Sequence, residues 1–460
     1  MLPQEAHPEI FQSGQPAPGN RRMHRAWAMY DWANSAYNLV ITSTIFPAYY
    51  EGITSVKQDG KVLHDEVSFF GMTMKNSALF DYSIAAAYLI VALLSPVLAA
   101  IADTRGNKKS YLRFFTFLGG LACCGLYFFR IQTLELGIIL AAVAALGYCG
   151  GLVFYNSYLP EIAAPEERDR VSAMGFARGY IGSVLLQIVC FALVLKPEWF
   201  GWLGIADGED AARVSFVMVG LWWMIWAQIP FRKLPAGRPS QRGHSRANPV
   251  VAGFAALRSV WRQASHMPRL KTFLGAYFCY NMGVGTVMLA ATIFGSKVLG
   301  LSATQLIATI LIIQLVAIAG AYLIAALSRR FGNLQTLFGV VVVWIGVCVA
   351  AYFTESANQF YALATVVGLV MGGIQSLSRS TYSKLIPETH DTTSFFSFYD
   401  VMEKMSIVLG MVSFGFIEEI TGTMRNSVLA LMIFFIFGGI LLLIAMRKPI
   451  SKGTATFVIP

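Results

Sequence analysis

Polar and charged side chains inside apolar segments are the residues of this chain that could do chemistry. Asp31, Ser35, Asn38 and Thr42 follow one another at helical spacing in an otherwise apolar segment. Such a stripe is costly against lipid, so it should face a water-filled cavity or another helix. The alternative for Asp31 is a cap at the start of its helix, where a carboxylate favours the helix dipole. We expect a cavity position for Asn38 and keep both roles open for Asp31.

A second polar stripe lies near the end of a later apolar segment and consists of Gln375, Ser378, Arg379 and Tyr382. A buried guanidinium needs an anion or backbone carbonyl groups as partners. Asp400 and Glu403 follow in the next segment, and Lys404 stands four residues after Asp400, within reach on one helix face. Arg379 is therefore interpreted in two compatible ways, as part of a structural charge network with Asp400 or Glu403 and as a group that binds a solute.

The motifs of soluble enzymes are missing from this sequence. It has no GxxxxGK[ST] phosphate loop, no HExxH pattern and no pair of CxxC motifs, and its six histidines lie outside the apolar segments. Histidine is the common metal ligand and proton relay, so its absence from these segments argues against an embedded metal centre. We expect no metal, no cofactor and no enzymatic activity.

Apolar segments must position these residues. The 460 residues are 56% hydrophobic and 13% charged, whereas soluble domains are roughly 45–50% apolar and about 25% charged. Segments of about 20 residues can cross a bilayer as helices, because lipid offers the backbone no hydrogen-bonding partners. The sequence contains twelve: 31–50, 79–102, 112–129, 135–158, 173–195, 212–230, 273–296, 304–327, 336–354, 358–383, 402–420 and 427–446. The predicted fold is an all-α membrane protein with twelve transmembrane helices.

Two internal landmarks indicate that the chain is a duplication. Gly150-Gly151 and Gly372-Gly373 stand at equivalent places with an offset of 222 residues, and the loops at 103–107 and 329–333 correspond with an offset of 226. Duplicated halves built of apolar spans are typical of secondary transporters. By the first offset Arg178 is the counterpart of Asp400, so equivalent positions carry opposite charges. We expect the chain to consist of a cytoplasmic tail (1–25), a six-helix bundle (26–230), a basic cytoplasmic linker (231–272), a second six-helix bundle (273–446) and a second cytoplasmic tail (447–460).

The net charge of +10 follows the expected sides of a membrane and does not indicate nucleic-acid binding. With alternate loops on opposite sides, 24 of the 35 Lys and Arg fall on the side of the tails and linker and 8 on the other side, while Arg178, Arg379 and Lys404 lie in or near the spans. Cytoplasmic loops carry the excess of basic residues. Both termini are therefore predicted to be cytoplasmic.

Residues 96–109 (PVLAAIADTRGNKK) resemble the loop between the second and third helices of the major facilitator superfamily. The resemblance implies that Asp103, with Arg105 in the same loop, meets the start of the eleventh helix, here near Asp400, and latches the two halves on the cytoplasmic side. The alternative is a simple helix end followed by cytoplasmic lysines.

Four further motifs extend this resemblance along the whole chain: residues 30–35 (YDWANS), 159–161 (LPE), 373–380 (GIQSLSRS) and 398–400 (FYD) with Lys404. Together they resemble the vacuole-effluxer-like family of the major facilitator superfamily. The resemblance implies a major facilitator fold, a central cavity lined by the first, fourth, seventh and tenth helices, and amino acids as the substrate class. Its fungal members release amino acids from the vacuole.

The resemblance also implies roles for residues in that cavity. Arg379 would bind the carboxylate of an amino acid, and Asp31 or backbone carbonyl groups would receive its ammonium group. The expected neutral or amide contacts are Asn34, Asn38, Tyr155, Asn156, Tyr280, Asn281 and Gln375. Asp103, Arg105, Arg178, Asp400, Glu403 and Lys404 form the expected gate or charge network.

The function expected from these observations is secondary active transport of a small organic solute by alternating access, as an exporter. The expected partners are the solute, the lipid bilayer and a coupling proton, with no nucleic acid, and the protein is expected to be a monomer in a bacterial cytoplasmic membrane rather than a vacuolar one. A lipid or lysolipid translocator on the same fold is one alternative. A non-transporting membrane sensor or assembly subunit is another.

Overall fold

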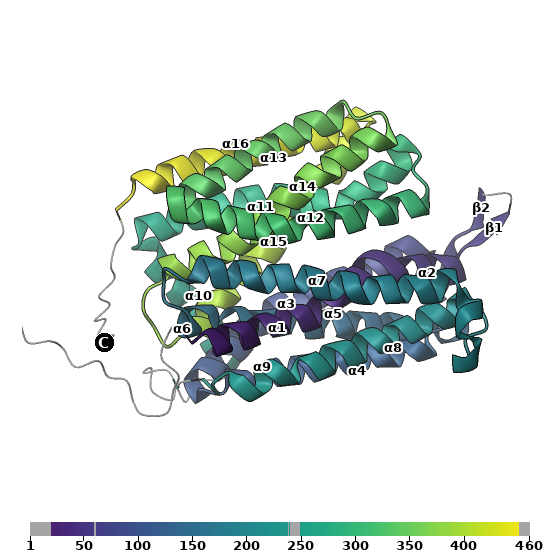
Figure 1. Ribbon diagram of the computed structural model, residues 1–460, viewed down its shortest axis with the longest axis horizontal. Coiled ribbons are helices and arrows are strands. Elements are labelled where there is room, and N and C mark those ends of the chain that lie inside the picture. The colour runs from purple at the N-terminus through teal and green to yellow at the C-terminus, as the bar shows by residue number, and fades with distance from the viewer. Residues whose placement is uncertain (1–19, 59–60, 238, 240–248, 450–460) are drawn as a thin grey trace, which may run out of the picture.

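The computed structural model describes residues 20–58, 61–237, 239 and 249–449 and places them in two helical bundles, one above the other in Figure 1. The predicted tails lie mostly outside the described residues. The N-terminal bundle contains α1 (Arg21–Ala36), η1 (Tyr37–Thr44), α2 (Ile45–Thr54), α3 (Asn76–Arg105), α4 (Lys108–Gly125), η2 (Leu126–Phe128), η3 (Ile131–Thr133), α5 (Leu134–Asn156), α6 (Leu159–Ile162), α7 (Arg168–Leu195), η4 (Pro197–Leu203), α8 (Gly208–Trp226) and α9 (Gln228–Lys233). The C-terminal bundle contains α11 (Pro268–Leu299), α12 (Ala303–Phe331), α13 (Asn333–Tyr352), α14 (Ala357–Leu385), α15 (Thr392–Thr421) and α16 (Met424–Arg447).

Twelve helical segments account for the predicted spans. Within the described residues, ten helices are long and apolar enough to cross a membrane. The other two segments are interrupted or charged: the first consists of α1, η1 and α2 in succession, and α15 carries Asp400, Glu403 and Lys404. The predicted all-α fold with two six-helix halves is confirmed.

Four short strands form two antiparallel hairpins between α2 and α3, which the sequence analysis did not predict. β1 (Val56–Gln58) pairs with β2 (Lys61–His64), and β3 (Glu66–Phe69) pairs with β4 (Met72–Lys75). The turn of the second hairpin has positive φ at Phe70 (47°) and Gly71 (81°), as two-residue turns between twisted strands require. We call this end of the molecule the hairpin end and the opposite end, where α3 ends and α15 begins, the linker end.

The first helix begins ten residues earlier than predicted and changes its winding in the middle. Asn20 caps α1 by accepting hydrogen bonds from the backbone N–H groups of Arg22 and Met23, and η1 is a π-helical stretch. A π-helix places hydrogen-bonded residues five apart and so shifts the faces of a helix. Asn38 therefore stays beside Asp31 on the cavity, while Thr42 is not among the lining residues.

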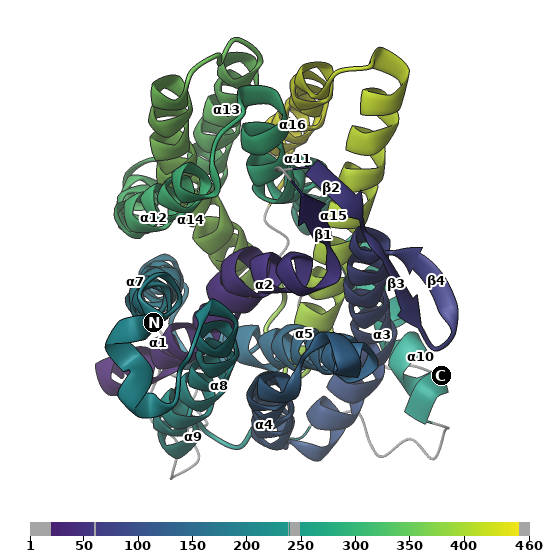
Figure 2. The same cartoon turned by 90° about the vertical axis from the view of Figure 1, so that its right-hand side faces the viewer.

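Each bundle has its own main apolar core, and the two bundles meet mainly along five long helices. α7 packs against α12 and α14, and α3 packs against α15. Figure 2 shows the halves from the hairpin end, with α11 to α16 above and the N-terminal helices below. Because the main cores do not merge, the halves are joined largely through contacts between side chains on these facing helices.

The segment predicted as a linker contains a helix, α10 (Pro249–Ser265), which packs on α3 and α15. Its face toward the bundles consists of small or apolar residues: Gly253, Ala256, Val260 and Ala264. A Cβ added at Gly253 would come within 2.5 Å of the Val97 Cα atom. The helix therefore lies tightly against the linker-end part of α3.

Candidate functional site: a polar cavity between the halves

A polar cavity of about 160 Å³ lies between the two bundles. Its lining comes from α1, η1, α5 and α7 of one half and from α11, α12, α14 and α15 of the other. The residues that carry its polarity are Asp31, Ser35, Asn38, Tyr148, Asn156, Tyr180, Ser183, Tyr277, Tyr280, Asn281, Gln314, Gln375, Ser378, Arg379, Tyr399 and Glu403. The lining thus includes the four helices implied by the resemblance and adds three more, α7, α12 and α15.

Arg379 crosses from the C-terminal half into the N-terminal half. Its Nη1 and Nη2 atoms lie 3.4 and 3.3 Å from the Asp31 Oδ2 atom, and both side chains are nearly inaccessible to solvent. Nε donates to the Ser172 hydroxyl at 3.0 Å, Nη2 to the Ser172 carbonyl at 3.0 Å and Nη1 to the Asn156 Oδ1 atom at 3.0 Å. Each nitrogen of the guanidinium therefore has a partner in the N-terminal half.

Aromatic rings enclose this guanidinium and add to its stabilisation. Its carbon atom lies 4.2 Å from the ring centroid of Phe176, 4.8 Å from Trp27 and 5.5 Å from Tyr155. Arginine stacks favourably on aromatic faces. Gly175 leaves room for the pair, since a Cβ there would lie 2.4 Å from the Asp31 Oδ2 atom.

The two interpretations of Asp31 are now distinguished by its place in the helix. Asp31 lies well inside α1, ten residues after Arg21, so it does not cap the helix. Its carboxylate accepts a hydrogen bond from the Tyr155 hydroxyl at 2.8 Å in addition to its contact with Arg379. Asp31 is therefore a cavity residue that links helices of both halves.

The predicted charge network has different partners from those expected. Asp400 forms a buried ion pair with Lys404 on the same helix, as the i,i+4 spacing predicts. Neither Asp400 nor Glu403 forms an ion pair with Arg379 in the described structure, so that part of the expectation is wrong. The reason is the direction of α14, which points Arg379 across the interface toward α1 rather than toward α15.

Asp103 joins the two halves at the linker end. Its carboxylate accepts hydrogen bonds from the backbone N–H groups of Thr393 (3.2 Å) and Ser394 (2.7 Å) and from the Ser394 hydroxyl (2.7 Å). A helix N-terminus favours an anion at this position. The partner is the first turn of α15, which begins at Thr392 and not near Asp400 as expected. The simple helix-end alternative is therefore insufficient.

A second polar contact closes the same end on the opposite side of the interface. Asp169, in the first turn of α7, accepts hydrogen bonds from Lys384 Nζ (2.6 Å), Asn333 Nδ2 (2.8 Å) and Ser328 Oγ (3.1 Å), all from the C-terminal half. At the same end, Glu161 of the N-terminal half accepts a hydrogen bond from the Thr392 hydroxyl at 2.7 Å. The linker end is therefore closed by polar contacts between the halves.

The other predicted gate residues make no such contacts. Arg105 is exposed, and the described part of the chain offers it no ion pair. Arg178 donates from Nη1 to the carbonyl oxygen of Arg25 at 2.6 Å, a contact within the N-terminal half. Neither residue joins the halves in this state.

The remaining predicted residues are distributed around the cavity and behind it. Tyr280 and Ser378 are joined by a hydrogen bond of 2.7 Å, Asn281 donates to the Ser406 hydroxyl at 2.7 Å, and Gln375 accepts from the Tyr180 hydroxyl at 2.9 Å. Asn34 is buried but does not line the cavity. The side-chain oxygen and nitrogen of Asn34 have no hydrogen-bond partner among the described residues.

Four tyrosines that were not predicted as site residues lie on the cavity: Tyr148, Tyr180, Tyr277 and Tyr399. Gln314 on the lining and the contact of Ser172 with Arg379 were not predicted either. A signal for the tyrosines exists, because a buried phenol usually needs a hydrogen-bond partner and so favours a polar surface over lipid. Of the tyrosines in the spans, only Tyr155 and Tyr280 were predicted to contact the solute.

Comparison with known proteins now identifies the family. A family described as "Vacuole effluxer Atg22 like" matches residues 19–454. The chain belongs to the vacuole effluxer Atg22-like family. One of its relatives, the MFS-type transporter YxiO of Bacillus subtilis (strain 168), is 31% identical over 92% of this chain and 94% of its own length. Autophagy-related protein 22 of Kluyveromyces lactis is 26% identical over 90% of this chain and 92% of its own.

Solved structures place the Atg22-like chain in the major facilitator fold. The transporter FucP in its outward conformation has a TM-score of 0.67 and 15% identity, and covers 92% of this chain and 98% of its own. A bacterial homologue of ferroportin in an outward-facing state has a TM-score of 0.63 and 13% identity, and covers 93% of this chain and 99% of its own. The chain is therefore a multi-pass membrane protein of a transporter family.

Proposed function

We propose that this chain is a secondary active transporter that moves amino acids across a membrane by alternating access, as an exporter. The single observation that carries the proposal is the charged cavity between the two halves, which is shut at the linker end by polar contacts that join the halves. Such contacts can break without disturbing either main core. Rocking of the halves around a fixed central site is the mechanism of transporters built from repeats.

Amino acids are the proposed substrate class because the cavity contains both signs of charge and the family description names an effluxer. A substrate carboxylate would bind Arg379 by taking the place of Asp31. Since Asp31 and Arg379 belong to different halves, this exchange would loosen one link between them. Binding and opening would then be coupled through the same arginine.

A proton is the proposed coupling ion, and Asp31 is the group proposed to carry it. A carboxylate that loses its arginine in a cavity is left without a counter-charge, and protonation removes that cost. The proposed membrane is the bacterial cytoplasmic membrane, with the linker end in the cytoplasm, and the proposed form is a monomer.

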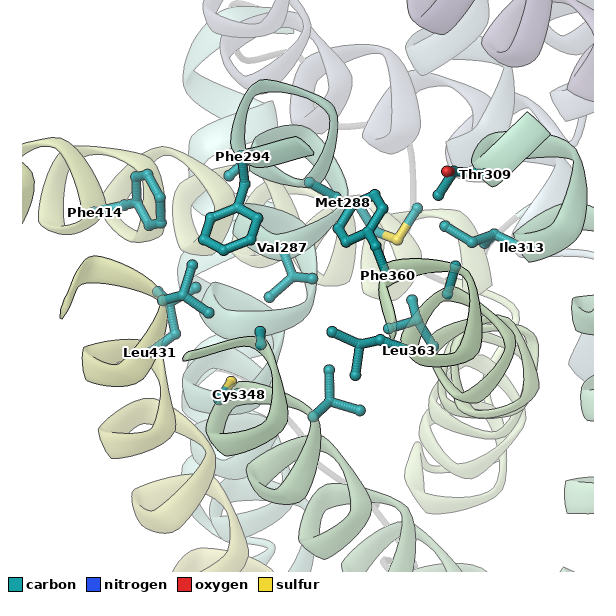
Figure 3. Close-up of a pocket in the computed structure, with 17 residues that line it drawn as sticks. Val287, Met288, Phe294, Thr309, Ile313, Cys348, Phe360, Leu363, Phe414 and Leu431 are labelled. Atoms are coloured by element: carbon teal, nitrogen blue, oxygen red, sulfur yellow. The ribbon is translucent and has the colours of Figure 1, made fainter. Parts of the chain in front are cut away.

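The lipid-translocator alternative gains no support from the second cavity. This apolar pocket is lined by residues such as Phe294, Phe360, Phe414 and Leu431, with Thr309 and Cys348 among its few polar side chains (Figure 3). All its lining residues belong to the C-terminal half. It therefore does not lie on the interface that alternating access opens.

Transport by purified protein in proteoliposomes tests the proposal. A labelled amino-acid mixture is supplied with and without a pH gradient, and we expect accumulation that the gradient increases. Protein-free liposomes and the Asp31→Asn variant serve as controls, and Asp31→Asn should lose the response to the gradient. Folded wild-type protein that moves no amino acid under either condition would contradict the proposal, and movement of a labelled lysolipid instead would favour the alternative.

A further inference from the structure

Glu403 is the acidic group of the cavity that lacks a cationic partner. The charged residues of the lining are Asp31, Arg379 and Glu403, and the first two are paired with each other. The neighbouring Lys404 is paired with Asp400. Among the described residues no Lys or Arg forms an ion pair with Glu403, although Lys404 attracts its carboxylate from the neighbouring position on the helix. When Glu403 is ionised, the lining therefore carries two negative charges and one positive charge.

An ionised carboxylate in such a place is costly unless a cation joins it. Its surroundings are those of a site for an organic cation. Tyr277 and Tyr399 are stacked with their ring centroids 4.4 Å apart, and Tyr280 meets Tyr277 edge-on at 5.7 Å. All three tyrosines line the cavity with Glu403. Because Tyr399 is stacked between Tyr277 and Tyr382, its ring faces are covered. The phenol oxygen atoms of these tyrosines can instead accept hydrogen bonds from an ammonium group.

A second group on the lining points to the same kind of ligand. The Gln314 Oε1 atom is buried and has no hydrogen-bond partner among the described residues. Glu403 and Gln314 Oε1 are both hydrogen-bond acceptors, whereas an ammonium group has three N–H donors and no acceptor. The lining therefore has acceptors on two helices, α15 and α12, that suit a hydrogen-bond donor.

We infer that Glu403, together with Tyr277 and Tyr399, is the subsite for the ammonium group of the substrate. This assignment rests on the proposed transport function and replaces Asp31 as the partner of the substrate amine. In the loaded site Glu403 holds the ammonium group and Arg379 holds the carboxylate, so each charge of an amino acid has a partner in the C-terminal half. Asp31 is then free to carry a proton.

Three probes that share the isobutyl side chain of leucine separate the two charges of the substrate. L-leucine has both charges, isoamylamine has the ammonium group alone, and 4-methylpentanoate has the carboxylate alone. Binding of each probe to purified full-length protein is measured by thermal shift and by calorimetry. Wild type should bind isoamylamine, and Glu403→Gln should bind it at least about 30-fold more weakly, as expected for loss of one partner of a desolvated charge pair.

The control is Glu419→Gln, which removes the same charge from an exposed position on the same helix and should leave binding unchanged. If Glu403→Gln folds poorly, Glu403→Asp keeps the charge but retracts it by one methylene, and it should weaken isoamylamine binding more than 4-methylpentanoate binding. Equal weakening of both probes by Glu403→Asp would contradict the assignment.

Several outcomes would overturn the subsite. One is unchanged isoamylamine binding in Glu403→Gln. If that variant also lost its response to a pH gradient, Glu403 would be a proton carrier and not the ammonium subsite. Failure of wild type to bind isoamylamine is another. Failure of the transport proposal is seen separately, because it requires that wild type moves no amino acid in proteoliposomes, whereas these binding measurements need no transport.

Discussion

At the scale of single residues, the contact between Asp31 and Arg379 has two functions in one place. It neutralises two charges that would be costly in a membrane-embedded cavity, and it connects α1 of one half with α14 of the other. Ser172 and Asn156 complete the hydrogen bonds of the guanidinium. Arg379 is therefore a structural link in the closed state and, by our proposal, a substrate ligand when that link opens.

Arg379→Gln should lower the stability of the purified protein by about 3–5 kcal/mol, because Asp31 would remain buried without its counter-charge. The double variant Asp31→Asn/Arg379→Gln should recover part of this loss, since neither charge is then unpaired. Unfolding titrations in detergent measure both effects. The control is Arg178→Gln, which removes a half-exposed arginine that bonds to a carbonyl of its own half. Equal stability of Arg379→Gln and wild type would show that the buried Asp31 carboxylate does not need Arg379 as its counter-charge.

At the scale of elements, two contacts between equivalent helices close the linker end, and the acidic residue lies on a different helix of the pair in each contact. In one contact the acid, Asp103, stands at the end of α3 and binds the start of α15. In the other the acid, Asp169, stands at the start of α7 and binds Ser328 near the end of α12 and Asn333. α3 and α12 occupy equivalent places in the two halves, and so do α15 and α7. The same pair of helices therefore meets in both contacts, but the acid is on α3 in one contact and on α7 in the other.

Asp103→Asn should weaken closure of the linker end, because it removes the negative charge that favours the N-terminus of α15. Loss of such a capping interaction typically costs about 0.5–2 kcal/mol. Spin labels at Ser110 and Glu388, both exposed at this end, should report a broader and longer distance distribution in the variant. The matched control is Asp207→Asn at the hairpin end, where Asp207 caps α8 within one half. A distance distribution equal to that of wild type would show that Asp103 only terminates its helix.

Close helix packing gives a second prediction at this scale. A Cβ at Gly372 would lie 2.4 Å from the carbonyl oxygen of Ala317, so α14 and α12 would have to separate. Overpacking of this kind typically costs about 1–3 kcal/mol, and Gly372→Ala should lower the melting temperature. Gly339→Ala is the control, because nothing lies within 4 Å of its added Cβ and alanine favours a helix. Equal melting temperatures for the two variants would mean that α12 and α14 can move apart without loss of stability.

At the scale of the whole molecule, two bundles with separate main cores meet at an interface that surrounds the cavity and combines polar contacts with a small alanine cluster on α7 and α12. Motion of one bundle against the other therefore disturbs polar contacts at the linker end more than the interior of either half. The uneven distribution of Lys and Arg, 24 against 8, predicts which end lies in the cytoplasm.

In a cysteine-free background, Ala236→Cys and Glu198→Cys report the two ends of the molecule. Both positions are exposed, the first near the linker end and the second in η4. In intact cells an impermeant maleimide should label Glu198→Cys at once, and Ala236→Cys only after the membrane is permeabilised. The reverse pattern would invert the proposed orientation.

The sequence by itself determined the properties that depend on order along the chain. Apolar length determined the spans, because the thickness of a bilayer sets the length of a helix that crosses it. The repeated Gly-Gly landmarks determined two halves, and the motifs around Asp31 and Arg379 indicated the family. These residues are also on the cavity, since a charge inside an apolar span has few other places to lie.

Only the tertiary structure decided which side chains meet. Asp31 and Arg379 are 348 residues apart, and their contact depends on the direction in which α14 faces. The partners of Asp103 depended on a helix that begins at Thr392, before the apolar segment by which it was recognised. Tyr277 and Tyr399 beside Glu403 were missed, because hydrophobicity is the same for a ring that faces a core and one that faces a cavity. Only the need of a buried phenol for a hydrogen-bond partner distinguishes the two. Contacts between distant segments follow from packing in three dimensions, which local composition does not specify.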